Sequence, residues 1–307
     1  PNGGVYIGTP EDLTIGEIKA GTDVVVNSDE DVTLGKIEAG NDVVVDAEAI
    51  KASEETTEPN IEAGNNADLT ARAGDIGTPE NVVTVQAGGE ITATAKADTT
   101  EGENGDVNLG LVGPAVIDKV EADNNVNIDA NDDVLVKDIV KAGNDLTIDA
   151  QGSINQETPD KVTFESGNDM TLNSADENVG DPEKYLQVQV GGELNAEAPN
   201  GGVYIGTPED LTIGKIEAGK DVVIDAEEDV TLGNIKAGEN VVVDADAIKA
   251  EEPAVGEAEP NIEAGKDVDL IANAGDIGTP ENGVTVQAGG EITATAKVDT
   301  TEGENGD

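Results

Sequence analysis

The sequence predicts an all-β protein, a right-handed parallel β-helix with about 19–24 residues and three short strands in each coil. Three observations support this fold class: long internal repeats, a shorter repeat inside them, and apolar residues that alternate with polar ones inside each short repeat. Alternation with a period of two is typical of strands, and short tandem repeats are typical of solenoids.

The long repeat is visible directly in the sequence. Residues 1–52 recur at 199–250 with 40 of 52 positions identical, and residues 59–106 recur at 260–307 with 41 of 48 identical. We expect one continuous β-solenoid over residues 1–307, with a repeat unit of residues 1–198 made of two diverged four-coil halves, and a second, partial unit at 199–307. The array is expected to continue beyond both ends.

The short repeat defines the elements of each coil. A short side chain followed by a turn, here called the anchor, recurs at Ala20, Ala39, Ala63, Ala87, Ala122, Ala142, Ser166, Val190, Ala218, Ala237, Ala264 and Ala288. One strand is expected to end at the anchor, a second to span four to six residues after it, and a third to lie near eleven to thirteen residues after it.

Fixed columns flank each anchor. Positions two before, four after and six after are apolar in every coil, and the position eight after is always Ala or Ser. We expect the apolar columns, including Val24, Val43, Ile128 and Leu146, to be buried, and the small residues to lie at a corner. The Gly that often follows the anchor is expected to adopt a positive φ angle.

Longer gaps between anchors predict loops. These fall at Ser53–Glu58, Thr99–Gly105, Thr158–Lys161, Asp176–Lys184, Pro199–Gly202 and Glu251–Glu259.

The composition excludes several classes of function. The chain has 67 acidic against 16 basic residues, a net charge of −51, which excludes a nucleic-acid binder. It has no apolar run of 18 residues, so we expect no membrane insertion. It has no Cys or His and one Arg, Arg72, so thiolate sites, histidine zinc sites and catalytic triads are excluded. The sequence therefore does not predict an enzyme.

Several strings resemble the repeats of filamentous-haemagglutinin-type bacterial surface adhesins. They are Ala-Gly-Asn-Asp-Leu-Thr-Ile-Asp-Ala at 142–150, Ser-Gly-Asn-Asp-Met-Thr-Leu-Asn-Ser at 166–174, and Ala-Gly-Gly-Glu-Ile-Thr-Ala-Thr-Ala at 87–95. The resemblance covers nearly the whole chain. It implies a right-handed β-helix shaft, secretion and an extracellular location at the cell surface.

An acidic or amide residue stands three positions after every anchor, and it suggests a calcium site. Hard cations bind several carboxylate and carbonyl oxygens. Asp23 with Asp42, and Asp145 with Asp169, would lie on successive coils and are the candidate metal ligands. The alternative is that these side chains cap turns by accepting hydrogen bonds from backbone amides. We expect no other cofactor.

A second candidate surface is apolar. The outward position five after the anchor is Val in four coils, at Val25, Val44, Val223 and Val242. Tyr6 and Tyr204 recur at the same interval and are expected to point outward as well. These residues are candidates for lateral contact, with ordinary strand propensity as the alternative explanation.

These features together predict a structural shaft of an extracellular fibre or giant repetitive adhesin. The expected partners are further copies of the same repeat, end to end, with lateral self-association into filaments. At about 4.8 Å per coil the axial repeat of the 198-residue unit would be roughly 38–48 Å. The alternative function is an acidic module that binds calcium or carbohydrate, and a polysaccharide-active enzyme is a remote third.

Overall fold

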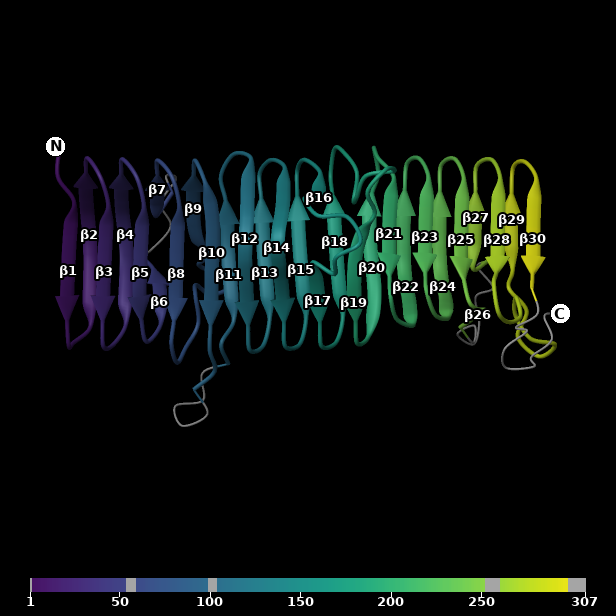
Figure 1. Ribbon diagram of the computed structural model, residues 1–307, viewed down its shortest axis with the longest axis horizontal. Coiled ribbons are helices and arrows are strands. Elements are labelled where there is room, and N and C mark those ends of the chain that lie inside the picture. Colours follow the sequence, from purple (N-terminus) through teal and green to yellow (C-terminus); the bar gives the residue numbers. More distant parts are fainter. Residues whose placement is uncertain (1, 54–58, 99–103, 252–259, 298–307) are drawn as a thin grey trace. The chain divides into compact units, whose positions relative to one another are not determined.

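The protein is an all-β parallel solenoid without helices in the part of the chain that a computed structural model describes, residues 2–53, 59–98, 104–251 and 260–297 (Figure 1). The predicted loops at Ser53–Glu58, Thr99–Gly105 and Glu251–Glu259 fall largely outside these residues. The chain divides into two compact units, Pro1–Gly152 and Ser153–Asp307, called unit 1 and unit 2.

Unit 1 consists of two parallel sheets, and the chain passes from one to the other in every turn. Sheet A has the order β1 (Val5–Thr9), β3 (Val24–Ser28), β5 (Val43–Ala47), β8 (Ala67–Ala71), β10 (Glu90–Ala95), β12 (Ala115–Ala122) and β14 (Val134–Ala142). Sheet B has the order β2 (Leu13–Ala20), β4 (Val32–Ala39), β7 (Ile61–Ala63), β9 (Val83–Ala87), β11 (Val107–Leu111), β13 (Val126–Ala130) and β15 (Leu146–Ala150), with β6 (Ile50–Ala52) also paired to β4.

Unit 2 begins with β16 (Ile154–Gln156) and has the same construction. Sheet C has the order β17 (Phe164–Ser166), β19 (Leu186–Val190), β21 (Val203–Thr207), β23 (Val222–Ala226), β25 (Val241–Ala245), β28 (Val268–Ala272) and β30 (Ile292–Ala296). Sheet D has the order β18 (Met170–Ser174), β20 (Glu193–Ala198), β22 (Leu211–Ala218), β24 (Val230–Ala237), β27 (Ile262–Ala264) and β29 (Val286–Ala288), with β26 (Ile248–Ala250) also paired to β24.

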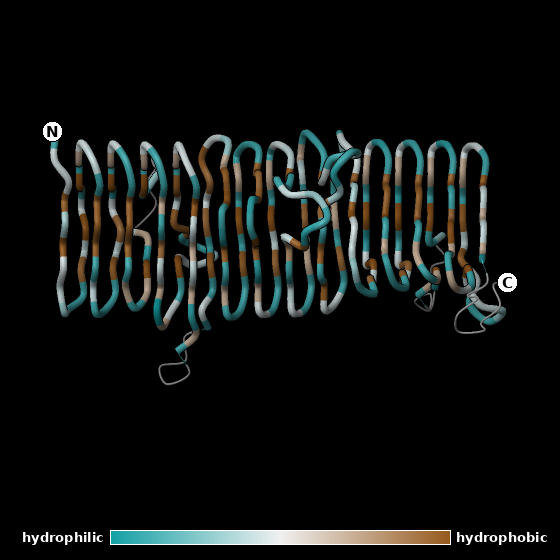
Figure 2. The backbone as a smooth tube through the Cα atoms, viewed as in Figure 1, coloured by the Kyte–Doolittle hydropathy of each residue, from teal (hydrophilic) through white to brown (hydrophobic). Residues whose placement is uncertain are grey.

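The predicted apolar columns form the core. Val24, Val43 and Leu146 are 0% exposed and Ile128 is 2% exposed, which confirms the prediction. Figure 2 shows apolar residues recurring along the strands of successive turns. Neighbouring turns pair residue for residue, so that Val24 lies between Val5 and Val43. Each buried Val, Ile or Leu contributes about 1.5–3 kcal/mol relative to an exposed one.

The strand count per coil differs from the prediction. In many coils the expected third strand and the anchor strand are one continuous strand, as in β4, because both belong to the same sheet and need no corner between them. They are separate where residues are inserted between them, as between β6 and β7. In β4 the pairing with β2 skips Gly16 and Gly35.

The prediction that the Gly after the anchor needs a positive φ is wrong. Positive φ angles among the described glycines occur at Gly77, Gly105, Gly113, Gly180 and Gly278, none of which follows an anchor. The glycines after anchors are needed for close approach instead. A Cβ atom on Gly64 would lie 2.2 Å from the carbonyl oxygen of Gly40 in the preceding turn.

The two four-coil halves are out of phase by half a turn. In unit 1 the anchor strands from Ala20 to Ala87 belong to sheet B, but those ending at Ala122 and Ala142 belong to sheet A. The gap between Ala87 and Ala122 contains β10 and β11, so it makes one and a half turns. Unit 2 repeats this switch, from sheet C at Val190 to sheet D at Ala218.

Candidate functional site

The acidic and amide column three after the anchor forms a ladder of turn caps. The Asp42 Oδ1 atom accepts the backbone N–H of Asn66 at 3.0 Å, and the Asn66 Oδ1 atom accepts that of Glu90 at 2.8 Å. In unit 2 the Asp169 carboxylate accepts the N–H of Glu193 at 2.9 Å. Each side chain thus accepts the backbone N–H of its counterpart one turn further along. Without this hydrogen bond, that N–H group would have no partner at the start of its strand.

Three of the four calcium candidates, Asp42, Asp145 and Asp169, take part in this ladder. Asp23 and Asp42 do lie on neighbouring turns, because the Val24 N–H donates to the Asp42 carbonyl at 2.9 Å. The Asp42 carboxylate accepts a second hydrogen bond from Asn65 Nδ2 at 2.7 Å. The Asp145 N–H donates to Asn125 Oδ1 at 3.2 Å. Within the described ranges no group of three or more acidic side chains has the geometry to hold a metal ion. The hydrogen bonds thus favour the capping interpretation.

A second acidic column stands on the outer face, seven after the anchor. Asp129 lies opposite Asp149 in unit 1, and Asp225 lies opposite Asp244 in unit 2. Desolvation, followed by the charges of Asp244 and Glu227, raises the pKa of Asp225. Desolvation and the charge of Asp46 raise the pKa of Asp68 in the same way. Stacked carboxylates are therefore electrostatically unfavourable in the folded protein at neutral pH.

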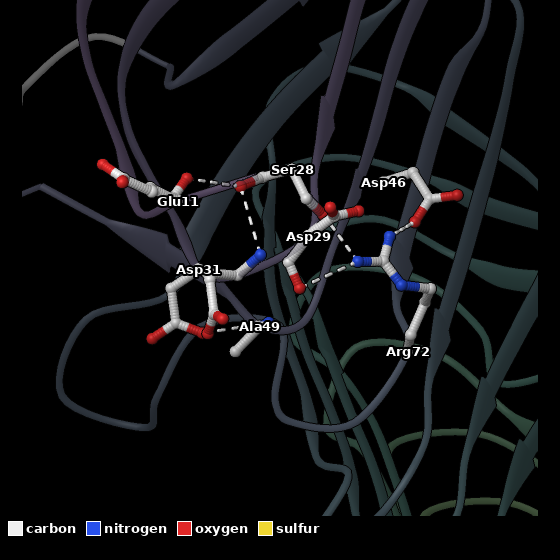
Figure 3. A network of polar contacts seen from close by, with 8 residues as sticks. Glu11, Ser28, Asp29, Asp31, Asp46, Ala49 and Arg72 are labelled. Carbon is white, nitrogen blue, oxygen red and sulfur yellow. Dashed lines mark hydrogen bonds and ion pairs between the residues drawn. The ribbon is translucent and has the colours of Figure 1, made fainter. Parts of the chain in front are cut away.

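One guanidinium relieves this repulsion in unit 1. Figure 3 shows Arg72 reaching back along the solenoid to pair with the Asp46 carboxylate and to donate to the carbonyls of Ser28 and Asp29. The single side chain therefore bridges three successive turns. In unit 2 the equivalent residue is Asn273. Its Nδ2 atom donates to the carboxylate of Asp244, the counterpart of Asp46. This contact joins two turns rather than three, and the Lys297 ammonium group donates to Asn273 Oδ1 at 2.6 Å.

The outward tyrosines and valines behave differently in the two units. In unit 1, Tyr6, Val25 and Val44 lie opposite one another in register, with Tyr6 69% exposed and the valines half-buried. In unit 2, Val223 and Val242 lie opposite one another and are likewise half-buried. These residues occupy outward positions, and lateral contact through them stays a prediction.

The environment of Tyr204 differs from the prediction. Tyr204 is 7% exposed, so the expectation that it points freely outward is wrong. The predicted loop Asp176–Lys184 passes directly beside it, and the Tyr204 N–H donates to the Val179 carbonyl at 2.8 Å. Burial raises the pKa of the Tyr204 phenol, with the charge of Asp221 adding to the effect.

A shallow groove that we did not predict runs over the corner of sheet B. It has a volume of about 330 Å³ and is lined by Ala39, Ala63 and Ala87, by Gly64 and Gly88, and by the row Glu38, Glu62 and Gln86. The sequence does indicate that a row of polar side chains lies here, because the residue before the anchor is outward in each of these coils. The Lys36 ammonium group donates to Glu38 at 2.8 Å and lowers the pKa of that carboxyl.

Mild acid should stabilise the protein through the stacked carboxylates. A carboxyl whose pKa is raised in the fold binds protons more tightly there than in the unfolded chain. Its unfavourable contribution to the free energy of unfolding therefore disappears as the pH falls from 7 towards about 4. Thermal melting of Asp225→Asn should therefore show a higher Tm than the parent at pH 7, and a smaller gain on acidification. Glu38→Gln is the matched control. Its pKa is lowered, so this variant should have a lower Tm at pH 7, and equal shifts for both variants would contradict the interpretation.

Stability should also depend strongly on salt. With a net charge of −51, self-repulsion destabilises the compact state, and screening relieves it. We expect Tm to rise by several degrees between low and moderate NaCl. CaCl₂ at matched ionic strength should give a similar rise. A larger shift with CaCl₂ would support the calcium alternative, and a Tm that falls in NaCl would contradict the electrostatic argument.

Comparison of the chain with protein-family models, characterised proteins and solved structures finds no match. No helix in the described part of the chain is long and apolar enough to cross a membrane.

Proposed function

We propose that the protein is a structural shaft of an extracellular fibre or giant repetitive adhesin, with further copies of the repeat as its partners. The single observation that carries this proposal is the parallel pairing of turn on turn in each unit, with core residues such as Val43 and Val243 fully buried. Such a ladder has a rigid, repetitive form and needs no ligand to complete its core.

The surface chemistry supports the same proposal. Side chains of the acidic and amide column accept hydrogen bonds from the backbone of neighbouring turns. These polar groups therefore stabilise the stacking of turn on turn. The high negative charge keeps a long rod soluble and opposes bundling in the absence of salt or divalent ions.

The test is where the protein is located on its native cells, and what shape its assemblies have there. Antibodies against the repeat should label the outside of intact, unpermeabilised cells, and negative-stain electron microscopy of the labelled material should show thin fibres. An axial repeat of roughly 38–48 Å is expected. Labelling that requires permeabilised cells, or globular particles without an axial repeat, would overturn the proposal.

A further inference from the structure

A turn with the pattern Gly-Thr/Asp-Pro-Glu-Asn/Lys, called the junction turn, stands ahead of β9, β19 and β29. It occupies residues 77–81 in unit 1 and residues 180–184 and 278–282 in unit 2. Its glycine has a positive φ angle in all three places. Its second and fifth residues exchange both backbone hydrogen bonds, as Thr279 and Asn282 do at 3.0 and 3.2 Å. The turn is therefore a closed, well-defined element of the fold.

The last side chain of the junction turn fastens it to an earlier coil. Asn81 Nδ2 donates to the Ala52 carbonyl at 2.7 Å, and Asn282 Nδ2 donates to the Ala250 carbonyl at 2.6 Å. Ala52 and Ala250 are the last residues of β6 and β26. We call this side-chain contact the latch, because it holds the turn against the end of that strand.

The backbone amide that follows the latch residue is free. The N–H groups of Val82, Tyr185 and Gly283 donate no hydrogen bond within the described ranges. A Cβ atom on Gly110 would lie 3.2 Å from Val82 Cγ2, so the following coil packs against Val82 and still leaves this amide free. The free amide is thus a property of the junction turn with its following coil in place.

The two latch asparagines differ in the residue that follows them. Asn81 precedes Val82, whereas Asn282 precedes Gly283. The backbone nitrogen of the next residue can reach an asparagine Cγ atom, because the attack closes a succinimide ring. A β-branched side chain restricts the rotations that bring the two atoms together, and glycine allows them most freely.

We propose that Asn282 is a site of spontaneous modification, in which the Gly283 backbone nitrogen displaces the side-chain amide as ammonia. The nitrogen gives up its proton and attacks Asn282 Cγ, so that an N–Cγ bond forms and the Cγ–Nδ2 bond breaks. Nδ2 takes up a proton through water and leaves as NH₃. Water then opens the succinimide at either carbonyl and gives aspartate or isoaspartate, so water is the only co-reactant.

The same dipeptide at Asn200 and Gly201 is protected by its place in the fold. The Gly201 N–H donates to the Ala198 carbonyl at 3.1 Å, and Gly201 is buried. A Cβ atom there would collide with the Glu177 carbonyl of the preceding coil. The attacking nitrogen is therefore engaged and its residue is fixed in place, whereas the nitrogen of Gly283 is free.

Modification of Asn282 would release the latch. A carboxylate has no proton to donate, and its oxygens repel the Ala250 carbonyl that the Asn282 amide now contacts. Isoaspartate also lengthens the main chain of the turn. The junction turn at residues 278–282 would thus separate irreversibly from β26, while the turn at 77–81 keeps its latch. This proposal goes beyond the proposed function and does not depend on it.

Peptide mapping of the full chain tests the reaction. The folded protein is incubated in mildly alkaline buffer, where more of the amide nitrogen is deprotonated, and is digested with trypsin at intervals. The three asparagines fall in separate tryptic peptides, residues 73–96, 185–215 and 267–297. Mass spectrometry follows the exchange of NH₂ for OH, and we expect Asn282 to react about tenfold or more faster than Asn81 and Asn200. In urea, Asn200 should react as fast as Asn282 while Asn81 stays slow.

Reciprocal variants exchange the residue after the latch. Gly283→Val reproduces the Asn81 dipeptide in unit 2 and should slow the reaction at Asn282 to the rate of Asn81. Val82→Gly should raise the rate at Asn81 to that of Asn282. Circular dichroism of each variant shows that it is folded, and the unchanged unit is its internal control.

Asn282→Asp imitates one product and tests the latch. The Gly278 N–H donates to the Ile248 carbonyl at 2.7 Å in the latched turn. Hydrogen exchange at Gly278 and Thr279 should be faster in Asn282→Asp than in the parent, and unchanged in Gly283→Val.

Equal rates at Asn200 and Asn282 in the folded protein, or a rate at Asn282 that Gly283→Val leaves unchanged, would overturn the proposed site. Unchanged hydrogen exchange in Asn282→Asp would overturn the release of the turn. Neither outcome affects the labelling of intact cells, so the proposed function is tested separately.

Discussion

Gly35→Ala is expected to destabilise the protein by about 3 kcal/mol, the scale of a severe overpacking change. A Cβ atom on Gly35 would lie 2.2 Å from the carbonyl oxygen of Gly16 and 2.5 Å from that of Ile15, both in the neighbouring turn. These are backbone atoms held in the sheet, so they cannot rotate aside. The two turns would have to separate locally, breaking the pairing of β2 with β4.

Gly16→Ala is the matched control for this prediction. Gly16 occupies the equivalent position one turn earlier, but a Cβ atom there would meet nothing within 4 Å. Neither glycine has a positive φ angle, so alanine brings no backbone strain at either site. Urea unfolding of dilute protein should show a large loss for Gly35→Ala and a change within about 0.5 kcal/mol for Gly16→Ala. Equal losses would show that local conformation, rather than the approach of turns, requires glycine here.

Asn60→Ala is the second large effect, again about 3 kcal/mol. Asn60 is 2% exposed and its amide joins three successive turns. The Nδ2 atom donates to the carbonyls of Leu34 at 3.3 Å and Gly35 at 3.0 Å. The Oδ1 atom accepts the N–H and the hydroxyl of Thr84 at 2.9 and 2.8 Å. Alanine would remove this amide partner from the part-buried Gly35 carbonyl and Thr84 N–H, at a cost of about 1–3 kcal/mol for each that water cannot reach. The Leu34 carbonyl would keep the N–H of Ser53 at 2.7 Å, and the Thr84 hydroxyl would keep the N–H of residue 60 at 2.8 Å.

Asn261→Ala tests the role of burial in that prediction. Asn261 makes the same contacts in unit 2, to Leu232, Gly233 and Thr285, but it is half-buried and Thr285 is exposed. Water can replace the lost amide there, so we expect a loss of about 1 kcal/mol. Hydrogen exchange of the neighbouring amides, together with urea unfolding, measures both variants. A larger loss for Asn261→Ala than for Asn60→Ala would contradict the argument.

Several particular features of the site could not be predicted from the sequence. The sequence correctly placed Val25 and Val44 together on the outer face, because period-two alternation determines which residues share a face of a strand. Tyr6 and Tyr204 stand in identical five-residue strands, and the sequence therefore predicted the same environment for both. Their exposure differs tenfold in practice, 69% against 7%, because the turn that covers Tyr204 comes from residues 176–184, outside the strand.

The sequence by itself determined the parallel solenoid and its core, because fixed apolar columns repeated in every coil can be buried together only by stacking coil on coil. Only the tertiary structure showed the features that depend on neighbouring turns. Glycines such as Gly64 allow the backbones of neighbouring turns to approach closely, and Asn60 joins three turns. The two four-coil halves are offset by half a turn. The physical reason is that these properties arise from contacts between residues about 20 or more positions apart, whose distances depend on the path of the chain around each corner.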